Sequence, residues 1–365
     1  MPDMIGWREP GTNEQLPRLA ALLASGGAIG LPTETEYAVV VSARHEEAVA
    51  RLAALRPEPF ALVARGASDA YRWLGNPSTL GRRLARRCWP GPVDLVFDAP
   101  ASGPLRELPA SVQQASCPEK RIAFTCPGHE AIHVLLDQLA GPLLLGTIKT
   151  GQPVDTAGEL AAAAGDLLAA IIDDGQTRYG HATTVVRIDG EKWQIQRAGI
   201  VPPGLVEQLA CCLILFVCTG NTCRSPLAEA LCKKLLADRL GCTPDSLPAQ
   251  GYLIESAGIS AQSGAPAAAE AVLTAQEWGA DLSQHRSQPI TPRLILDADH
   301  VITMTQGHLR VITDYFQELD ASPRLLSAEG EDLPDPIGSG LPVYQECARM
   351  IRANLEKLLS EIQRS

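Results

Sequence analysis

The amino-acid sequence predicts an α/β fold divided into two domains. The chain has 365 residues, which is more than one hydrophobic core usually organises. Near residue 200, Pro202, Pro203 and Gly204 are expected to break any regular element. Beyond them, strand-like and helix-like segments alternate, which is typical of a doubly wound parallel sheet. We therefore expect one domain over residues 1–207 and a second over residues 208–365.

The elements of the second domain follow one another in a regular order. Its first strand is the apolar segment 212–217, and further strands are expected over 252–258 and 299–305. Helices are expected over 226–240 and 266–279, with a long terminal helix from about Val343. The first domain gives mixed strand and helix signals without an internal repeat. Ligands of a doubly wound sheet bind where its strands end, so a site is expected in the loops that follow them.

Composition and charge exclude several classes of protein. The formal net charge of −11 argues against broad capture of a nucleic-acid backbone, and aromatic residues at 4% are too few for base-stacking platforms. No apolar run approaches the ~20 residues of a membrane helix, and the first residues do not form a signal peptide. We therefore expect no membrane partner.

The ten cysteines indicate thiol chemistry rather than a metal site or a disulfide framework. They include no Cys-x-x-Cys pair, and no cysteine and histidine cluster has zinc-ligand spacing. Reduced thiols are typical of the cytoplasm, which is the expected location. The sequence predicts no metal ion and no cofactor.

The segment 216-FVCTGNTCRSP-226 places unusual chemistry at the end of the first strand of the second domain. Pro226 is expected to open the following helix, so the preceding loop lies at a helix N-terminus with free backbone N–H groups. Gly220 is expected to supply the backbone angles that turn several N–H groups inward. The segment therefore predicts a binding loop for a phosphate dianion.

Three side chains of this loop fit phosphoryl transfer. The donors that would hold phosphate also stabilise a thiolate at Cys218, which makes this residue the candidate nucleophile. Arg224 can grip two phosphate oxygens, and the Ser225 hydroxyl can donate to the thiolate when it leaves. Cys218 as an ordinary buried thiol is the alternative, which the ordered strand, loop, arginine and serine disfavour.

With these residues in place, the chain from about Leu213 to its end resembles the low-molecular-weight protein tyrosine phosphatases. The resemblance implies that Asp335, which precedes Pro336, is the general acid, although Asp332 competes for that role. It implies that Asn221 holds the loop in shape, supported by Ser256. His308 matches a histidine of the same network. The expected phosphate-binding residues are Thr219, Gly220, Asn221, Thr222, Cys223 and Ser225.

The resemblance also bears on substrate and redox behaviour. Family members with a cysteine at the position of Cys223 form a reversible disulfide with the nucleophile, and we expect the same here. Thr222 resembles the protein arginine phosphatase branch, and Ile337 and Gly338 stand where tyrosine-directed members carry aromatic residues. Phosphoarginine is therefore favoured over phosphotyrosine, with a neutral variation at Thr222 as the alternative.

The first 200 residues resemble the threonylcarbamoyl-AMP synthase (YrdC-like) domain, a twisted α/β sheet around a large positively charged cavity. The segments that carry this resemblance are 30–40, 55–63, 88–97, 183–188 and 197–199. Several catalytic groups of that family are replaced. The lysine of its Lys-x-Arg is absent beside Arg56, its Ser-x-Asn pair aligns with Gly146 and Ile148, and Val93-Asp94 replaces a threonine. Lys149 is a candidate substitute for the lost cation, but we expect it to be a solvated surface residue. The domain is expected to be degenerate.

Three hypotheses follow from the two halves. The leading one is a cysteine-dependent protein phosphatase, a hydrolase acting on phosphoarginine or phosphotyrosine in proteins. In this hypothesis the partner is a phosphorylated protein, and the YrdC-like domain is a candidate binder of a nucleotide or RNA. The second is an L-threonylcarbamoyladenylate synthase with an accessory phosphatase domain. The third is a regulatory binding protein that uses both halves for recognition.

Overall fold

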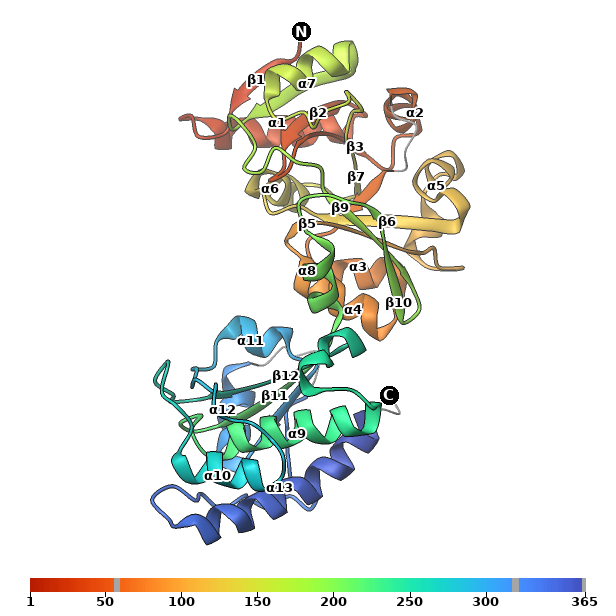
Figure 1. Cartoon of the computed structure of the whole chain (residues 1–365). Helices are drawn as coiled ribbons and strands as arrows, with labels where there is room; N and C mark the ends of the chain where they lie inside the picture. The colour runs from red at the N-terminus through yellow and green to blue at the C-terminus, as the bar shows by residue number, and fades with distance from the viewer. Residues whose placement is uncertain (56–59, 317–321, 363–365) are drawn as a thin grey trace. The chain divides into compact units, whose positions relative to one another are not determined.

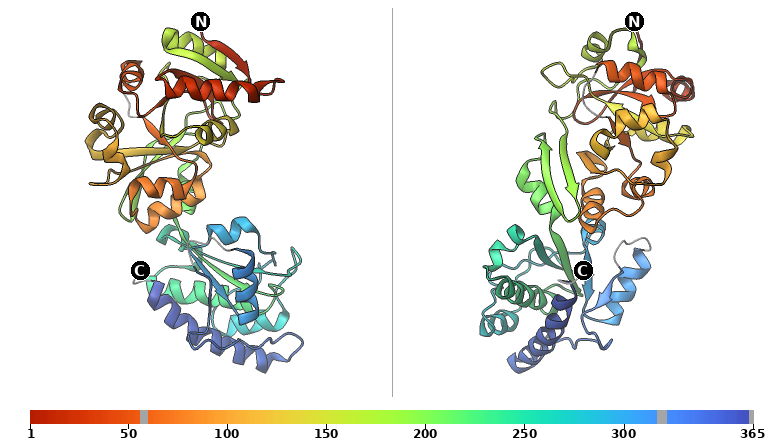
Figure 2. Two further views of the ribbon diagram at one scale, coloured as in Figure 1. Left: turned by 180° about the vertical axis from the view of Figure 1, so that it is seen from behind. Right: turned by 90° about the vertical axis from the view of Figure 1, so that its right-hand side faces the viewer.

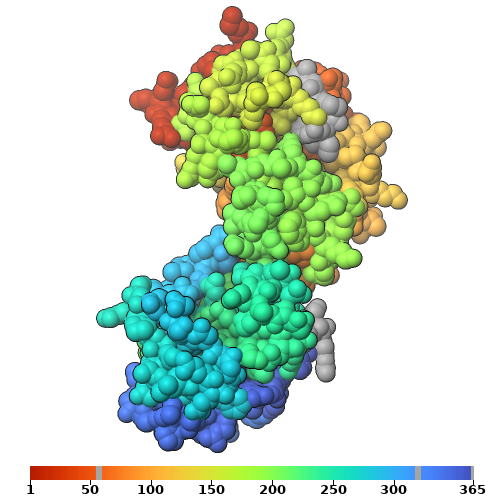
Figure 3. All heavy atoms as spheres, viewed as in Figure 1, coloured from red at the N-terminus to blue at the C-terminus, as the bar shows by residue number. Residues whose placement is uncertain are grey.

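The computed structural model describes residues 1–55, 60–316 and 322–362 of the chain (Figure 1). They form two compact units, Met1–Leu209 and Ala210–Ser365, compared with an expected boundary after residue 207. Side chains fill the spaces between the ribbons of each unit (Figure 3). Among the described residues, no helix is both long and apolar enough to pass through a bilayer.

The N-terminal unit is built on one ten-stranded mixed sheet of order β1-β8-β2-β3-β7-β4-β6-β5-β9-β10. Its strands are β1 Asp3–Gly6, β2 Ala28–Pro32, β3 Tyr37–Ser42, β4 Ala61–Val63, β5 Gly91–Asp98, β6 Arg121–Cys126, β7 Leu143–Gly146, β8 Leu168–Asp173, β9 Thr184–Asp189 and β10 Lys192–Arg197. Its α-helices are α1 Thr12–Ala24, α2 Glu46–Leu55, α3 Ala67–Leu74, α4 Thr79–Cys88, α5 Ala110–Ser116, α6 Glu130–Gln138, α7 Ala157–Ala164 and α8 Pro203–Ala210. Short 3₁₀ turns are η1 Pro104–Glu107, η2 Pro118–Lys120 and η3 Gly165–Leu167.

Helices α1 and α6 cover one face of the central strands of this sheet. Leu19 of α1 and Leu135 of α6 are fully buried in one cluster with Ile29 and Val40 of the neighbouring strands. Strands β2 and β3 are buried at every position, which explains their continuous apolar sequence. The mixed strand and helix signals of the first half thus correspond to one sheet with helices packed on it.

The C-terminal unit has the doubly wound parallel sheet that the sequence predicts. Its strands are β11 Cys212–Cys218, β12 Tyr252–Gly258, β13 His300–Thr303 and β14 Arg324–Leu325, and they pair in the order β12-β11-β13-β14. All three pairings are parallel. The helices are α9 Arg224–Leu240, α10 Ala269–Glu277, α11 Pro292–Asp297, α12 Gln306–Tyr315 and α13 Leu341–Ile362, with 3₁₀ turns η4 Pro244–Ser246 and η5 Pro248–Gln250.

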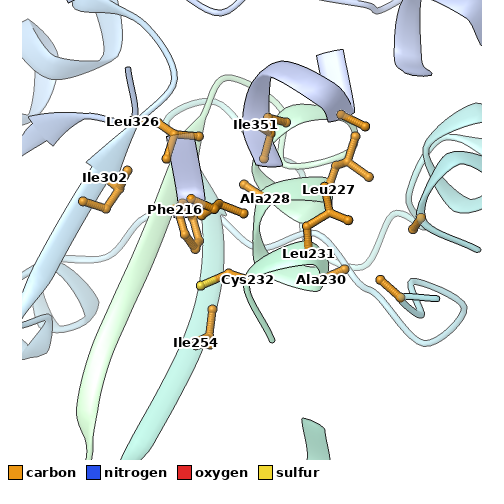
Figure 4. Packing of buried hydrophobic residues seen from close by; sticks show 14 of the residues in the cluster. Phe216, Leu227, Ala228, Ala230, Leu231, Cys232, Ile254, Ile302, Leu326 and Ile351 are labelled. Carbon is orange, nitrogen blue, oxygen red and sulfur yellow. The ribbon is translucent and has the colours of Figure 1, made fainter. Parts of the chain in front are cut away.

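The helices cover both faces of this sheet because β11 is apolar on both faces (Figure 2). Phe216 faces α9, α10 and α13, and Figure 4 shows it beside Ala228 of α9 within that cluster. Leu215, on the opposite face, packs with Ile295 of α11 and Ile312 of α12. This double burial fixes β11 at the centre of the sheet, and its carboxyl end carries the loop with Cys218.

Two local predictions are wrong. The segment at Pro203 and Gly204 is not irregular, because α8 begins at Pro203, and proline is tolerated in the first helical turn, where its missing N–H has no intrahelical partner. Helix α9 begins at Arg224, two residues before Pro226, which therefore lies inside the first turn. Arg224 and Ser225 are thus helical residues, so the backbone of the helix fixes the direction of both side chains. Arg56 lies outside the described residues.

Candidate active site

The loop between β11 and α9 turns sharply at Asn221 rather than at Gly220. Asn221 has a φ of 55°, in the left-handed region that non-glycine residues rarely adopt, whereas Gly220 does not have a positive φ. The expectation that Gly220 supplies the special backbone angles is therefore wrong. Asparagine tolerates this region better than most residues, and its buried side chain supplies the contacts that hold the turn.

Cys218 lies at the bottom of this loop with its sulfur held by two donors. The Ser225 hydroxyl donates to Sγ at 2.9 Å, and the Asn221 backbone N–H donates at 3.2 Å. The residue is buried, with 3% of its surface exposed. The N-terminus of α9 points at the same place, so hydrogen-bond donors and the positive end of the helix dipole surround the sulfur. The loop thus presents hydrogen-bond donors to the sulfur and to an anion bound beside it.

Asn221 is braced through both its side chain and its backbone. Its Nδ2 donates to Ser225 Oγ at 3.0 Å and to Ser256 Oγ at 2.8 Å, while its Oδ1 accepts from the Gln288 backbone N–H at 2.8 Å. Its carbonyl oxygen lies 2.8 Å from His285 Nε2. Ser256 thus contacts Asn221 as the resemblance implies, and the sequence analysis missed His285 and Gln288.

The support continues from Ser256 into the body of α9. Ser256 Oγ donates to Glu229 Oε2 at 2.6 Å, and Lys233 Nζ lies 2.5 Å from the other carboxylate oxygen of Glu229. Because Asn221 donates to Ser256, the chain of contacts runs from the loop to a charged pair one turn apart on the helix. Glu229 was also missed, since a Glu and Lys four residues apart on a helix usually forms a surface pair without a role in a site.

Arg224 and Asp335, which are far apart in the sequence, are in contact at the mouth of the loop. Arg224 Nη2 contacts Asp335 Oδ2, and Nη1 donates to the Leu333 carbonyl at 3.3 Å. The side chain of Arg224 is 6% exposed and that of Asp335 is 40% exposed, so the arginine is buried and the aspartate is accessible to solvent. Asp332 instead accepts from the Gln306 backbone N–H at 2.6 Å, at the start of α12. The structure therefore brings Asp335, and not Asp332, to Arg224.

His308 contacts the loop at Thr219. Its Nε2 lies 2.9 Å from Thr219 Oγ1, whereas the histidine that reaches Asn221 is His285. His308 is buried, and burial together with the charge of Arg224 lowers its pKa to about 4. Its ring is therefore neutral at pH 7. Its Nδ1 is buried without a hydrogen-bond partner among the described residues.

Cys223 and Thr222 complete the loop. Cys223 is buried, and its sulfur lies 3.2 Å from the hydroxyl of Tyr344, a fully buried residue of α13. Burial and the contact with Cys223 raise the pKa of Tyr344, so the phenol stays protonated at physiological pH. Thr222 is half-buried, with its Oγ1 3.6 Å from Cys223 Sγ, and Ile337 is 67% exposed close to Asp335. All ten cysteines are free thiols in this structure.

The N-terminal unit contains a cavity of about 500 Å³. The charged residues in its described lining are Glu34, Asp94, Glu119, Arg121 and Arg197. Acidic groups outnumber basic ones, so the expected positively charged character of this cavity is wrong for the described residues. Between Gly146 and Ile148, the side chain of Thr147 lines the cavity. Asp94 also lines it, in the segment where the synthase family carries a threonine. Lys149 is exposed and is not part of the described lining.

No metal centre is visible in the part of the chain that the structure describes, since no three His, Cys, Asp or Glu side chains gather as ligands there. The candidate site is therefore a cysteine, an arginine and an aspartate around an anion-binding loop. This arrangement defines a class of protein, the phosphatases that form a bond between cysteine and phosphorus.

Comparison with known proteins places the chain more closely. Residues 213–365 match the family model described as low molecular weight phosphotyrosine protein phosphatase, and residues 21–199 match the Sua5, YciO and YrdC model, described as telomere recombination. The chain is 33% identical over 154 residues to the protein-arginine-phosphatase of Geobacillus stearothermophilus, covering 41% of this chain and 95% of the relative. It is 35% identical over 150 residues to a probable low molecular weight protein-tyrosine-phosphatase, EpsP, of Ralstonia nicotianae, covering 41% and 94%.

Through its C-terminal unit, the chain belongs to the low molecular weight phosphotyrosine protein phosphatase family. A solved structure, a doubly substituted form of P. abyssi Sua5, is similar over 97% of both chains, with a TM-score of 0.51 and 16% identity. At this identity the likeness concerns the fold alone. It agrees with an α/β chain in which an N-terminal Sua5-like domain precedes a second α/β domain.

Proposed function

We propose that this chain is a protein phosphatase that hydrolyses phosphoarginine or phosphotyrosine through a phosphocysteine intermediate. The observation that carries the proposal is the pair of donors on the Cys218 sulfur, which lies in a loop at a helix N-terminus with Arg224 at its mouth. A thiol held by donors and facing an arginine is suited to attack an anionic phosphorus centre. A merely structural cysteine needs none of these contacts.

The reaction has two displacements. The Cys218 thiolate attacks phosphorus, the bond from phosphorus to the leaving nitrogen or oxygen breaks, and Asp335 gives that atom its proton. Arg224 and the loop N–H groups hold the equatorial oxygens in both steps. Water then attacks phosphorus, Asp335 accepts a proton from it, and the sulfur leaves as a thiolate that Ser225 and Asn221 stabilise. Thr219, Gly220, Thr222 and Cys223 are proposed to contribute to phosphate binding, and Ser256 and His308 to support the loop.

A nucleophile test separates this proposal from a pure binding function. Wild type and Cys218→Ser are compared with p-nitrophenyl phosphate, with Asp335→Asn as a third variant. We expect Cys218→Ser to lose activity entirely and Asp335→Asn to lose about 10²–10⁴-fold, the usual contribution of general acid–base catalysis. Turnover by Cys218→Ser at the wild-type rate would contradict the proposal, and inactivity of the folded wild type would favour the binding function.

Phosphoarginine is the proposed preferred substrate. Thr222 offers a half-buried hydroxyl within the loop, and the residue after Asp335 and Pro336 is the aliphatic Ile337 rather than an aromatic one. The proposal is tested by kcat/KM for matched phosphoarginine and phosphotyrosine peptides, in wild type and in Thr222→Ile. We expect the ratio to favour phosphoarginine in wild type and to fall in the variant. A ratio that Thr222→Ile leaves unchanged refutes the role of this side chain.

The second candidate function is threonylcarbamoyl-AMP synthesis in tRNA modification by the N-terminal unit, with a nucleotide or RNA as partner. The match of residues 21–199 and the Sua5-like fold favour it. The carboxylates in the described lining of the cavity argue against this function, because they repel the phosphates of ATP. Threonine- and bicarbonate-dependent release of pyrophosphate from ATP measures this activity directly. A cytoplasmic location is part of the same proposal and is checked by fractionation.

A further inference from the structure

The C-terminal unit has a pocket beside α9 that takes no part in the proposed reaction. Its volume is about 360 Å³, at the lower end of the range for small-molecule sites. The lining comes from α9, from η4 and from the segment 279–285, which follows α10. We call this hollow the α9 pocket. Neither of the two displacements uses it.

Two side chains of the α9 pocket belong to the network that holds the phosphate loop in shape. Glu229 accepts a hydrogen bond from Ser256, which in turn accepts one from the Asn221 side chain. His285 Nε2 lies 2.8 Å from the Asn221 carbonyl oxygen, and because a carbonyl can only accept, this nitrogen is the donor. A ligand in the α9 pocket therefore lies against residues that support Asn221 without entering the loop.

The lysines of the α9 pocket are Lys233 and Lys234. Lys233 Nζ lies 2.5 Å from Glu229, and Lys234 Nζ lies 2.5 Å from Asp238. Each partner is four residues away on the same helix, and the lysine side chains are 38% and 33% exposed, so both pairs are weak. An ammonium group has three N–H donors, and each lysine uses one of them in its pair. The remaining donors are suited to the carboxylate of a ligand.

Two aspartates, Asp245 and Asp281, add negative charge from η4 and from the segment 279–285. Within the described ranges, Asp245 makes neither a hydrogen bond nor an ion pair. Asp281 accepts from the Ser283 backbone N–H at 2.7 Å, and this hydrogen bond lowers its pKa, so the carboxyl is ionised at neutral pH. Neither carboxylate has a lysine or arginine partner among the residues described, so both are available to a cationic group.

We propose that the α9 pocket binds a small zwitterion, an α-amino acid or a compound with the same two charges. Its carboxylate lies against Lys233 and Lys234, and its ammonium group lies against Asp245 and Asp281. A simple anion would leave the aspartates without a partner, and a simple cation would not use the lysines. Only a molecule that carries both charges pairs with both sets of groups.

The same contacts give the α9 pocket a means of regulating the phosphate loop, and this step rests on the proposed phosphatase function. Lys233 is the cation beside Glu229, and Glu229 accepts the hydrogen bond of Ser256. A bound carboxylate shares the ammonium group of Lys233 with Glu229, which loosens the support that Ser256 gives to Asn221. We therefore expect occupancy of the pocket to lower kcat/KM of the phosphatase.

Calorimetric titration of the full chain tests the proposal with glycine, alanine and arginine, and with acetate and methylamine as probes that carry one charge each. The pocket variants are Lys234→Gln and Asp245→Asn. The matched control is Lys357→Gln, which removes an exposed lysine of α13 that is paired with Glu329 in a similar way. We expect at least one amino acid to bind wild type and the control equally. Either pocket variant should weaken that binding roughly tenfold, as for hydrogen bonds to charged groups.

Three outcomes overturn the proposal. They are no binding of any of the amino acids at millimolar concentration, binding of acetate or methylamine as tightly as the amino acid, and binding that neither pocket variant weakens. Thermal unfolding verifies that each variant is folded.

Hydrolysis of p-nitrophenyl phosphate is measured in the same samples, with and without the amino acid that binds. A lower kcat/KM with the pocket occupied supports the link to the phosphate loop, and an unchanged value overturns that link. Calorimetry does not depend on turnover, and Cys218→Ser can be titrated in the same way. Failure of the pocket proposal and failure of the proposed phosphatase function are therefore distinguishable.

Discussion

Asn221 is the residue whose replacement most directly tests how the phosphate loop is held. Asn221→Ala removes the three side-chain hydrogen bonds to Ser225, Ser256 and the Gln288 N–H. At ~1 kcal/mol each, these bonds contribute about 3 kcal/mol. An alanine with a φ of 55° adds roughly 1–2 kcal/mol, because the left-handed region disfavours a Cβ without a compensating side-chain contact.

The total of about 4 kcal/mol corresponds to roughly a thousandfold in an equilibrium between the formed loop and a relaxed one. Since part of the cost also lowers the stability of the fold, we expect kcat/KM for p-nitrophenyl phosphate to fall by about 10²–10³-fold. Competitive inhibition by inorganic phosphate should weaken in parallel, because the same N–H groups bind it.

Asn221→Gly is the matched control for the backbone contribution. Glycine accepts the left-handed φ but makes none of the side-chain bonds, so its kcat/KM should exceed that of the alanine variant by a few-fold. The assay is steady-state kinetics combined with thermal unfolding of each variant. The reasoning is refuted if both variants are folded and remain within about twofold of wild type in kcat/KM.

Three further predictions concern the surroundings of the loop. In His308→Gln, the fall of the unfolding temperature between pH 6.5 and pH 4 should be smaller than in wild type. The folded-state pKa of His308 is lowered from 6.5 to about 4, so the neutral ring stabilises the fold fully above pH 6.5 and this contribution is lost as the pH falls toward 4. Equal pH profiles of the two proteins would contradict this. Ile337→Tyr should raise kcat/KM for phosphotyrosine peptides about fivefold, as an aromatic pair is worth ~1 kcal/mol, and no change would exclude a substrate contact there. Cys223→Ser should make inactivation by peroxide irreversible, so that added thiol no longer restores activity, and full recovery would argue against a disulfide with Cys218.

The sequence was sufficient for the parts of the site that are continuous along the chain. The apolar segment that forms β11 is buried on both faces, and such a segment followed by a cysteine, an arginine and a serine has few alternative structures. For the same reason β12 begins and ends where the sequence predicts. The turn residue was assigned to Gly220 because glycine most often takes a positive φ, whereas here the side-chain contacts of Asn221 stabilise that angle.

Residues that act through tertiary contacts could not be found in this way. His285 and Gln288 lie outside every strand and helix of the structure, and their relevance depends on the approach of their segment to Asn221. Tyr344 belongs to the apolar face of a long helix, which is an ordinary core position until its hydroxyl is seen beside Cys223. The charge of the cavity in the N-terminal unit similarly depends on which lining side chains form ion pairs, and the sequence does not indicate these pairs.

The contact between Arg224 and Asp335 has a consequence for the order of events at the site. In the proposed mechanism, the guanidinium that binds the substrate phosphate is in contact with the carboxylate that acts as the acid. If this mechanism holds, we expect an arriving phosphate to take the place of Asp335 at Arg224. The proposed acid is thus released from Arg224 by its own substrate, and without a bound anion the two side chains stay paired.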